Sequence, residues 1–384
     1  MPTRVRSYSK INLGLAIGPP RSDGFHSLAT LYQTLALHDL VTVSARLGET
    51  TRIRLTSNDP RVPCDWRNTA WKMAEKTLSS LDLCADVKIH IQKNLPVQGG
   101  MGAGSANAAA ALLGLERELG LRLMETTRQA LAAQVGSDVP LFLVGGSVLG
   151  YDRGQMVDPA ADMQLDGQTE IPCVIALPGI GVSTPTAFRD WDKLLAGSAE
   201  TTPDLHNPPI RDTIRELSRT YASVVVRQGK RGASGIFPDP SSGLNARDTP
   251  EKQQGLSREQ RHTSLESSNT HGESGIENDL AESSLLALVR TGIENDFETV
   301  VFPQYPLLRE IKRQLMGSPQ ATGLSGESPA IYAALSGSGS ALFGLYRTQT
   351  DASAAQRRLQ QNGVEAIVTK TMPRARYWSE MFAE

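Results

Sequence analysis

The chain has 384 residues, a formal net charge of −2 and three cysteines. This length is enough for about two domains with separate cores, and the charge provides no basic field for nucleic acid or a membrane surface. The cysteines form no Cys-x-x-Cys pair, which argues against a disulfide framework or a zinc site. Since no apolar run could span a membrane and no uninterrupted apolar segment follows the N-terminal arginines, we expect a soluble cytoplasmic protein.

Predicted strands and helices alternate along the first part of the chain. The patterns predict strands over 5–8, 40–45, 51–55 and 87–91 and helices near 71–81, 106–119 and 124–135. A buried strand over 173–177 then ends at a Pro-Gly pair, which is a candidate domain boundary. We expect an N-terminal domain over residues 1–165 and a C-terminal domain over residues 166–384.

Residues 228–274 differ in composition from the rest of the C-terminal domain. From position 240 to 274 the apolar side chains, prolines aside, are Leu244, Ala246, Leu256 and Leu265. Such a segment cannot bury enough apolar surface to offset the entropy lost on ordering. We therefore predict a disordered insertion at about 228–274, with a solvated regulatory loop as the alternative.

A glycine-rich loop over residues 96–107 lies between a predicted strand and an alanine-rich predicted helix. Such a loop presents unpaired backbone N–H groups and the positive end of the helix dipole, which together can hold phosphate. It is not a Walker A loop, because Ser105 and not lysine follows Gly104. A dinucleotide fingerprint is disfavoured, because a second helix pattern follows where a strand with an acidic residue is needed. A tight turn without a ligand is the alternative.

Two polar motifs precede this loop. Lys10 and Asn12 are two residues apart on an alternating strand, so they share one face, which is most often exposed to solvent. An Asp-Gly pair at 23–24 indicates a turn that presents Phe25 and His26. A lone histidine is more often structural than functional, but an aromatic ring beside a histidine also suits a planar heterocycle.

Two further motifs follow the loop. Asp138 comes shortly after the last residue of a predicted helix and lies beside the apolar segment 139–144, where a capping or turn aspartate is the alternative. Residues 336–340 (Ser-Gly-Ser-Gly-Ser) form a second glycine-rich turn that enters an apolar strand. Each motif alone is common, but their combination is specific.

The combined motifs resemble those of the GHMP kinase superfamily, in which the first motif corresponds to Lys10 and Asn12, the second to residues 96–107 and the third to residues 336–340. The resemblance covers residues 4–190 and 283–380. Within the superfamily, the chain is most similar to the 4-diphosphocytidyl-2-C-methyl-D-erythritol kinase family. The residues that narrow the resemblance from the superfamily to this one family are Lys10-Ile-Asn-Leu-Gly-Leu, Arg21-x-Asp-Gly-Phe-His-x-Leu, Gln33, Gly136-Ser-Asp-Val-Pro, Ser183-Thr184 with Phe188, and Asn295-Asp-Phe-Glu.

The resemblance implies an α+β fold with two domains, the first like domain 2 of ribosomal protein S5 and the second ferredoxin-like. It implies transfer of the γ-phosphoryl group of ATP, with Mg²⁺, to the 2-hydroxyl of the methylerythritol moiety. Asp138 would accept the hydroxyl proton, and Lys10 would stabilise the carboxylate and hold the hydroxyl. In the alternative account both residues mainly position and neutralise, because the transition state is loose.

The resemblance also assigns the nucleotide site. Ser105 would lie near the metal-bound phosphates, so that it is the candidate metal ligand. The other residues implied to contact ATP are Pro96, Val97, Gln98, Gly99, Gly100, Met101, Gly102, Ala103, Gly104 and Ala106, with Asn68 and Lys93 as further contacts. Ala103 and Ala106 stand where the family usually has glycine and serine, so Ala103 requires a negative φ and Ala106 loses one phosphate contact.

For the acceptor, the resemblance places cytosine between Phe25 and Phe188, with His26 at its polar edge and with Asn12 and Thr184 along the sugar or diphosphate. Phe25 stands where tyrosine is common in the family. The phenylalanine ring can still stack on the base but lacks the hydroxyl group. We expect a monomer or weak homodimer with a small-molecule substrate and no nucleic-acid or membrane partner. The alternatives are a superfamily kinase that acts on homoserine or a mevalonate intermediate, and a non-catalytic sensor with the same fold.

Overall fold

The computed structural model describes residues 1–97, 99–198, 283–317 and 328–384. Gln98 of the glycine-rich loop and the predicted insertion over 228–274 lie outside these residues. All three cysteines are described, and each is a free thiol. Within the described ranges, no helix has both the length and the apolar character needed to cross a membrane.

Seven strands of the described chain form the first sheet, which is antiparallel except where β3 runs parallel to β4. The main order is β11 (Phe382–Ala383), β1 (Thr3–Pro20), β2 (His26–Leu47), β4 (Ala85–Gln92) and β3 (Arg52–Ser57), while β5 (Ser147–Asp152) pairs with β2 and β6 (Met156–Pro159) pairs with β5. The predicted strand over 5–8 is therefore only the start of an 18-residue strand. Residues 7–18 of this strand are all buried, so exposed and buried positions do not alternate there, and the pattern marked only its start as a half-buried strand.

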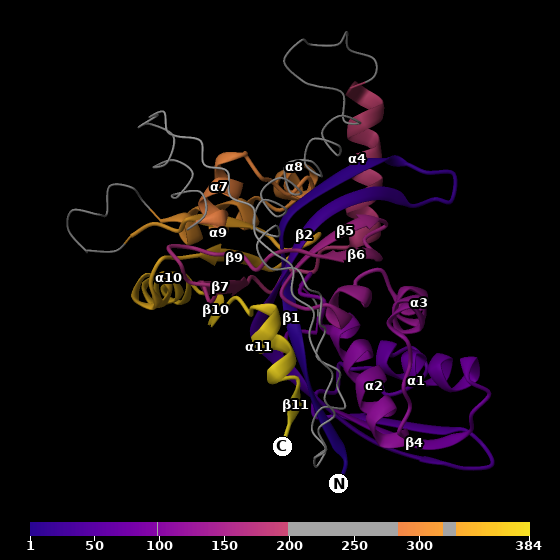
Figure 1. Cartoon of the computed structure of the whole chain (residues 1–384). Coiled ribbons are helices and arrows are strands. Elements are labelled where there is room, and N and C mark those ends of the chain that lie inside the picture. Colours follow the sequence, from indigo (N-terminus) through magenta and orange to yellow (C-terminus); the bar gives the residue numbers. More distant parts are fainter. Residues whose placement is uncertain (98, 199–282, 318–327) are drawn as a thin grey trace, which may run out of the picture.

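Helices cover one face of this sheet (Figure 1). α1 (Thr69–Ser80) and α2 (Ala103–Leu119) lie on the strands, and α3 (Glu125–Val135) packs on these two helices and is followed by the 3₁₀ turn η1 (Pro140–Leu143). The small residues of α2 let it lie close to the strands, since a Cβ at Gly114 would lie 2.6 Å from the Val43 side chain. α2 ends as predicted at Gly120, which adopts a left-handed φ of 63°.

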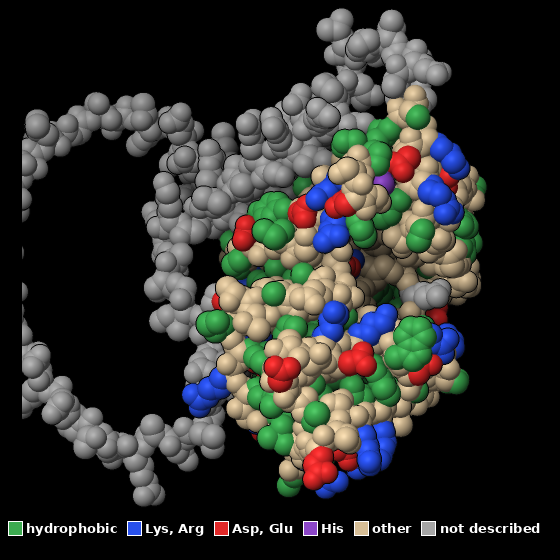
Figure 2. Space-filling view, turned by 90° about the vertical axis from the view of Figure 1, so that its right-hand side faces the viewer, with side chains coloured by type: hydrophobic (Ala, Val, Ile, Leu, Met, Phe, Trp, Pro, Cys, Tyr) green, Lys and Arg blue, Asp and Glu red, His purple; other side chains and the backbone are tan. Residues whose placement is uncertain are grey.

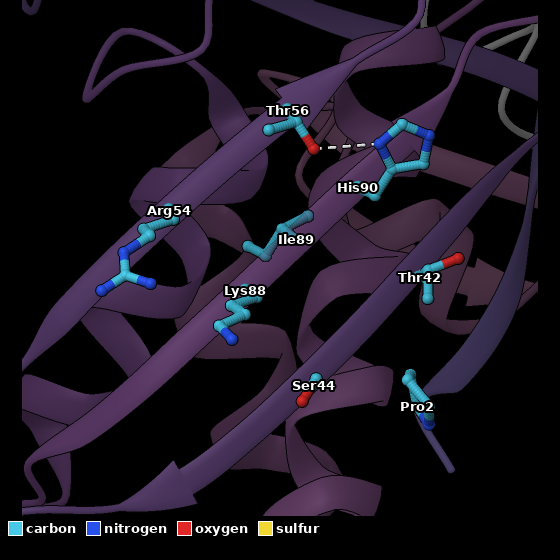
Figure 3. Close-up of a pocket in the computed structure, with 8 residues that line it drawn as sticks. All are labelled: Pro2, Thr42, Ser44, Arg54, Thr56, Lys88, Ile89 and His90. Carbon is cyan, nitrogen blue, oxygen red and sulfur yellow. Dashed lines mark hydrogen bonds between the residues drawn. The ribbon is translucent and has the colours of Figure 1, made fainter.

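On the opposite face, β3, β4 and the last part of β2 present mostly polar side chains, because buried and exposed positions alternate along these strands. A shallow hollow of about 430 Å³ lies over β2, β3 and β4 (Figure 3). It is lined by Pro2, Thr42, Ser44, Arg54, Thr56, Lys88, Ile89 and His90. This hollow shares no residue with the site predicted from the sequence.

A second sheet is built from the later part of the chain. Its four strands in the described residues are antiparallel, in the order β10 (Glu365–Lys370), β7 (Pro172–Leu177), β9 (Leu342–Leu345) and β8 (Tyr332–Leu335). The helices of this part are α4 (Thr184–Ser198), α7 (Ser284–Arg290), α8 (Phe297–Gln304), α9 (Pro306–Met316), α10 (Gln349–Gln361) and α11 (Arg374–Ser379). The α+β fold class is thus confirmed.

β1 joins the two parts of the molecule. The buried apolar residues of the described chain form three clusters, and β1 contributes to each of them. Its contributions in order along the strand are Val5 and Tyr8, then Ile11 and Leu13, then Leu15 and Ile17. In Figure 1 the β1–β2 hairpin accordingly runs from the helices of the first sheet to the region of α4 and α8.

The C-terminal end of the chain returns to the first sheet. β11 pairs with the start of β1, with Ala383 opposite Arg4. In α11, the Tyr377 hydroxyl donates to the carbonyl of Phe142 at 2.6 Å. The division of the chain near residue 165 stays a prediction, and the structure adds that the residues after about 374 pack on the first part.

Residues just before α8 hold the far end of β1. The Leu15 N–H donates to the Glu294 carbonyl, the Asp296 N–H donates to the Leu15 carbonyl, and the Ile17 N–H donates to Asp296 Oδ2 at 2.7 Å. Burial raises the pKa of Asp296 to about 6, against the opposing effect of the bond from Ile17. The ionised carboxylate is therefore a cost to folding above pH 6, which is relieved as the pH falls toward 4.

We predict that Asp296→Asn stabilises the protein by about 2 kcal/mol at pH 8, because the amide keeps an acceptor for Ile17 and removes the buried charge. At pH 4.5, where the wild-type carboxyl is mostly protonated, the difference should almost vanish. Urea unfolding of both proteins at the two pH values measures this. An equal difference in unfolding free energy at both values would contradict the assignment.

Candidate active site

Lys10 and Asn12 share one face of β1, as predicted, but that face is buried. Lys10 is 3% exposed and Asn12 is 1% exposed. Lys10 Nζ donates to Asn12 Oδ1 at 2.6 Å and lies 3.4 Å from Asp138 Oδ2. Asn12 Nδ2 in turn donates to Thr30 Oγ1 on β2 at 2.8 Å. The positive charge of Lys10 is therefore compensated inside the protein rather than by water.

Asp138 follows α3 through an extended Gly136 and lies just before η1. Its side chain is 33% exposed, so a ligand can reach the carboxylate. The Tyr32 hydroxyl donates to Asp138 Oδ1 at 3.1 Å, while Lys10 lies at the other oxygen. Burial, and then the nearby Asp138 carboxylate, raise the pKa of Tyr32 well above its usual value, so this hydroxyl remains a donor. The carboxylate is thus oriented at both oxygens.

Tyr32 and Thr30 are site residues that the sequence reasoning missed. In the β1–β2 register, Tyr32 lies opposite Asn12. The Asp-Gly turn at 23–24 could have indicated them. If that turn closes a β-hairpin, the two strands on either side of it pair antiparallel, and residues near 30–34 then lie opposite residues 10–14. Register shifts after Tyr8, Asn12 and Ile17 made that pairing inexact.

The glycine-rich loop leads into α2 three residues earlier than predicted. Gly102, with a φ of 71°, is the N-cap, and the helix begins at Ala103. Ala103 is helical and is not among the residues with positive φ, so the requirement stated for its methyl group is met. No described side chain caps the helix, which leaves the first-turn N–H groups free to bind an anion.

The loop side chains divide between the core and the solvent. Met101, Ala103 and Ala106 are buried. The Ala106 methyl packs in the buried apolar cluster that also contains Val5 and Tyr8. Ser105 is partly exposed in the first turn of α2, and no described residue hydrogen-bonds its hydroxyl.

The loop lies directly on Lys10 and on the turn at 336–340. The Lys10 N–H donates to the Met101 carbonyl at 3.1 Å, and a Cβ at Gly102 would lie 3.1 Å from Lys10 Cγ. The Ser336 hydroxyl donates to the Gly100 carbonyl at 3.0 Å. The three superfamily motifs therefore meet at one place. More than 80 residues separate the first motif from the second along the chain, and more than 220 separate the second from the third.

Asn295 fixes the turn from its other side. Its Nδ2 donates to the carbonyls of Leu335 and Gly337, both at 2.8 Å. Its Oδ1 accepts the N–H of Phe297 at the start of α8. The Asn-Asp-Phe-Glu segment thus positions both β1 and the second glycine-rich turn.

Lys93 and Asn68, the two further nucleotide contacts expected, have structural partners. Lys93 Nζ pairs with the fully buried Asp39 at 2.6 Å. Asp39 also accepts the N–H of Leu95 at 2.7 Å and so fixes the entry to the glycine loop. Asn68 caps α1 by accepting the Ala70 N–H. Their contact with a nucleotide stays a prediction.

The predicted acceptor residues lie where β1, β2 and α4 meet. His26 and Phe188 stack with ring centroids 4.7 Å apart, and Thr184 Oγ1 is 2.6 Å from Ser338 Oγ. Phe25 is half exposed and carries the Arg153 guanidinium over its ring at 4.7 Å. Among the described residues, Phe188 stacks on His26 and meets the Phe297 ring edge-on, and no ring contact joins it to Phe25. Figure 2 shows one face of the molecule, which is hollowed between an upper and a lower part.

Comparison with known proteins shows the family. Models for the "GHMP kinases N terminal domain" and "GHMP kinases C terminal" match residues 68–146 and 278–365. A 4-diphosphocytidyl-2-C-methyl-D-erythritol kinase of Streptomyces coelicolor is 34% identical over 64% of this chain and 81% of its own length. The chain belongs to this family of kinases.

Other members of the kinase family align over shorter spans. The Rhodococcus jostii protein is 42% identical over 51% of this chain and 61% of its own length. The protein from Nocardioides is 36% identical over 54% of this chain and 66% of its own length. The chain thus spans somewhat less than two thirds of these two relatives.

Solved structures confirm the fold. A crystal structure of 4-(cytidine 5′-diphospho)-2C-methyl-D-erythritol kinase covers 96% of this chain and 98% of its own, with a TM-score of 0.58 and 22% identity. A mevalonate kinase from L. major has a TM-score of 0.54 and 14% identity, with 96% of each chain covered. At these identities the likeness concerns the fold, which several GHMP kinases share.

We predict that Gly100→Ala abolishes ATP binding, or raises the dissociation constant at least about tenfold. Gly100 has a φ of 74°, and a Cβ there would lie 2.0 Å from the Ser336 carbonyl oxygen, so the two glycine-rich segments would separate. Calorimetric titration with Mg-ATP measures the effect.

Gly120→Ala is the matched control, because Gly120 has a similar φ of 63° and a Cβ there would meet nothing within 4 Å. It should cost about 1 kcal/mol of stability through backbone strain and leave ATP affinity unchanged. Equal ATP affinities for the two variants would contradict the placement of the loop.

Proposed function

We propose that the chain transfers the γ-phosphoryl group of ATP to the 2-hydroxyl of 4-diphosphocytidyl-2-C-methyl-D-erythritol, a step in the non-mevalonate route to isoprenoid precursors. The observation that carries the proposal is the Lys10–Asp138 pair, which lies against the glycine-rich loop and has one partly exposed carboxylate. The family membership supports the substrate.

The chemistry follows from the positions of the two charges. Asp138 would accept the hydrogen bond of the acceptor hydroxyl and, as the new P–O bond forms, its proton. Lys10 would hold the same oxygen and offset the negative charge that the phosphoryl group brings. Since the transition state of phosphoryl transfer is loose, a large share of the rate enhancement comes from this alignment.

The nucleotide would lie on the loop from Pro96 to Ala106. The free N–H groups at the start of α2 and the helix dipole would bind the triphosphate in place of a Walker lysine. Mg²⁺ usually keeps several waters and takes one or two protein ligands besides the phosphates. The unpartnered hydroxyl of Ser105 suits that role, and the ion would neutralise charge between the transferred phosphoryl group and the leaving phosphates.

The acceptor would lie between the loop at 336–340 and the aromatic residues. Phe25, His26 and Phe188 would bind the cytosine, and Asn12 and Thr184 would line the path to the reacting hydroxyl. The half-exposed Phe25 ring beside His26 supports a planar base, which neither homoserine nor mevalonate has. Retention of both Lys10 and Asp138 supports a kinase over a non-catalytic sensor. We also infer a cytoplasmic location and a monomer or weak homodimer.

The proposal is tested by coupled measurement of ADP release with Mg-ATP and each of three acceptors. We expect turnover with the diphosphocytidyl acceptor and none above background with homoserine or mevalonate. Comparable kcat/KM values for the three acceptors would overturn the assigned specificity, and ATP binding without turnover on any of them would favour the sensor.

A further inference from the structure

One carboxylate outside the predicted site contacts the predicted base-binding residues. Asp192 and Phe188 are four residues apart on α4, so they face the same way. Phe188 stacks on the His26 ring with an interplanar angle of 15°, and Asp192 Oδ1 lies 2.7 Å from His26 Nε2. One turn of α4 therefore holds His26 both by its face and by one ring nitrogen.

The contact with Asp192 determines where the imidazole proton lies. An ionised carboxylate accepts hydrogen bonds and cannot donate one, so Nε2 must carry the hydrogen. In the neutral imidazole, Nδ1 is then a bare acceptor. No described residue hydrogen-bonds Nδ1, and it is not among the buried polar atoms that lack a partner, so it is open to solvent or a ligand.

We propose that Asp192 is a positioning residue that makes His26 Nδ1 an acceptor for the 4-amino group of cytosine. This inference rests on the proposed function. Cytosine presents an N–H donor at position 4, and uracil presents a carbonyl oxygen there. Two acceptors would face each other in the uracil complex, which leaves both without a partner in a desolvated site. Asp192 thus selects a cytidine over a uridine substrate without touching the base.

The deciding variant is Asp192→Asn. An asparagine side chain can accept from Nε2–H or, with its amide turned over, donate to a bare Nε2. Both tautomers of His26 then become available, and Nδ1 can donate to the uracil oxygen. The ratio of kcat/KM for the cytidine substrate to that for its uridine counterpart should fall at least about tenfold, mainly through a gain with the uridine substrate.

Two companion variants separate this role from simple anchoring of α4. Asp192→Glu keeps a carboxylate and should keep the ratio within about threefold of wild type. Asp190→Asn, two residues away, alters a carboxylate that contacts Lys193 and Gln304 and should leave the ratio unchanged. The dissociation constant for Mg-ATP, measured on every variant, verifies that each one is folded.

The outcomes are distinct. A lower ratio in Asp192→Asn alone supports the inference. An unchanged ratio, or an equal loss of activity with both substrates, overturns it and leaves the proposed function standing. If the wild-type protein releases no ADP with the cytidine substrate, the proposed function itself fails. If the wild type prefers the uridine substrate, Nδ1 faces another edge of the base and the inference is wrong.

Discussion

The ammonium group of Lys10 is a positive charge that the fold holds almost entirely away from water. Such a charge is tolerated only with close polar partners, and removing one partner of a buried pair is far more costly than removing both. Asn12 lies at hydrogen-bond distance, and Asp138 approaches from the segment after α3. The same requirement that stabilises Lys10 therefore places a carboxylate beside the glycine-rich loop.

The rest of the structure serves to keep β1 and its neighbours in register. β1 contributes to all three apolar clusters, and residues 294–296 hold its far end through two backbone hydrogen bonds and one from the Ile17 N–H to the Asp296 carboxylate. Asn295 extends the same segment to the turn at 336–340. The second part of the chain thus fixes the geometry of a site whose charged residues belong to the first part.

The sequence predicted those features that depend on local pattern. Spacing and composition alone predicted the glycine-rich loop before a helix, the shared face of Lys10 and Asn12, and the end of that helix at Gly120. Features that depend on distant contacts were missed. Tyr32 orients Asp138 only because the hairpin and the residues after α3 meet, and Asp39 neutralises Lys93 from another strand. The burial of Lys10 and Asn12 could not be predicted either. Alternation along a strand shows which residues share a face, but it does not show what packs against that face.

Lys10 and Asp138 should act as one catalytic unit, which a double-mutant cycle on kcat tests directly. Lys10→Met and Asp138→Asn should each lower kcat by about 100-fold or more, while ATP affinity of Asp138→Asn stays within about threefold of wild type. The double variant should be little slower than the slower single variant, because residues that act together are strongly non-additive. If the two losses instead multiply in the double variant, the residues act independently and the pair is not the unit that the geometry indicates.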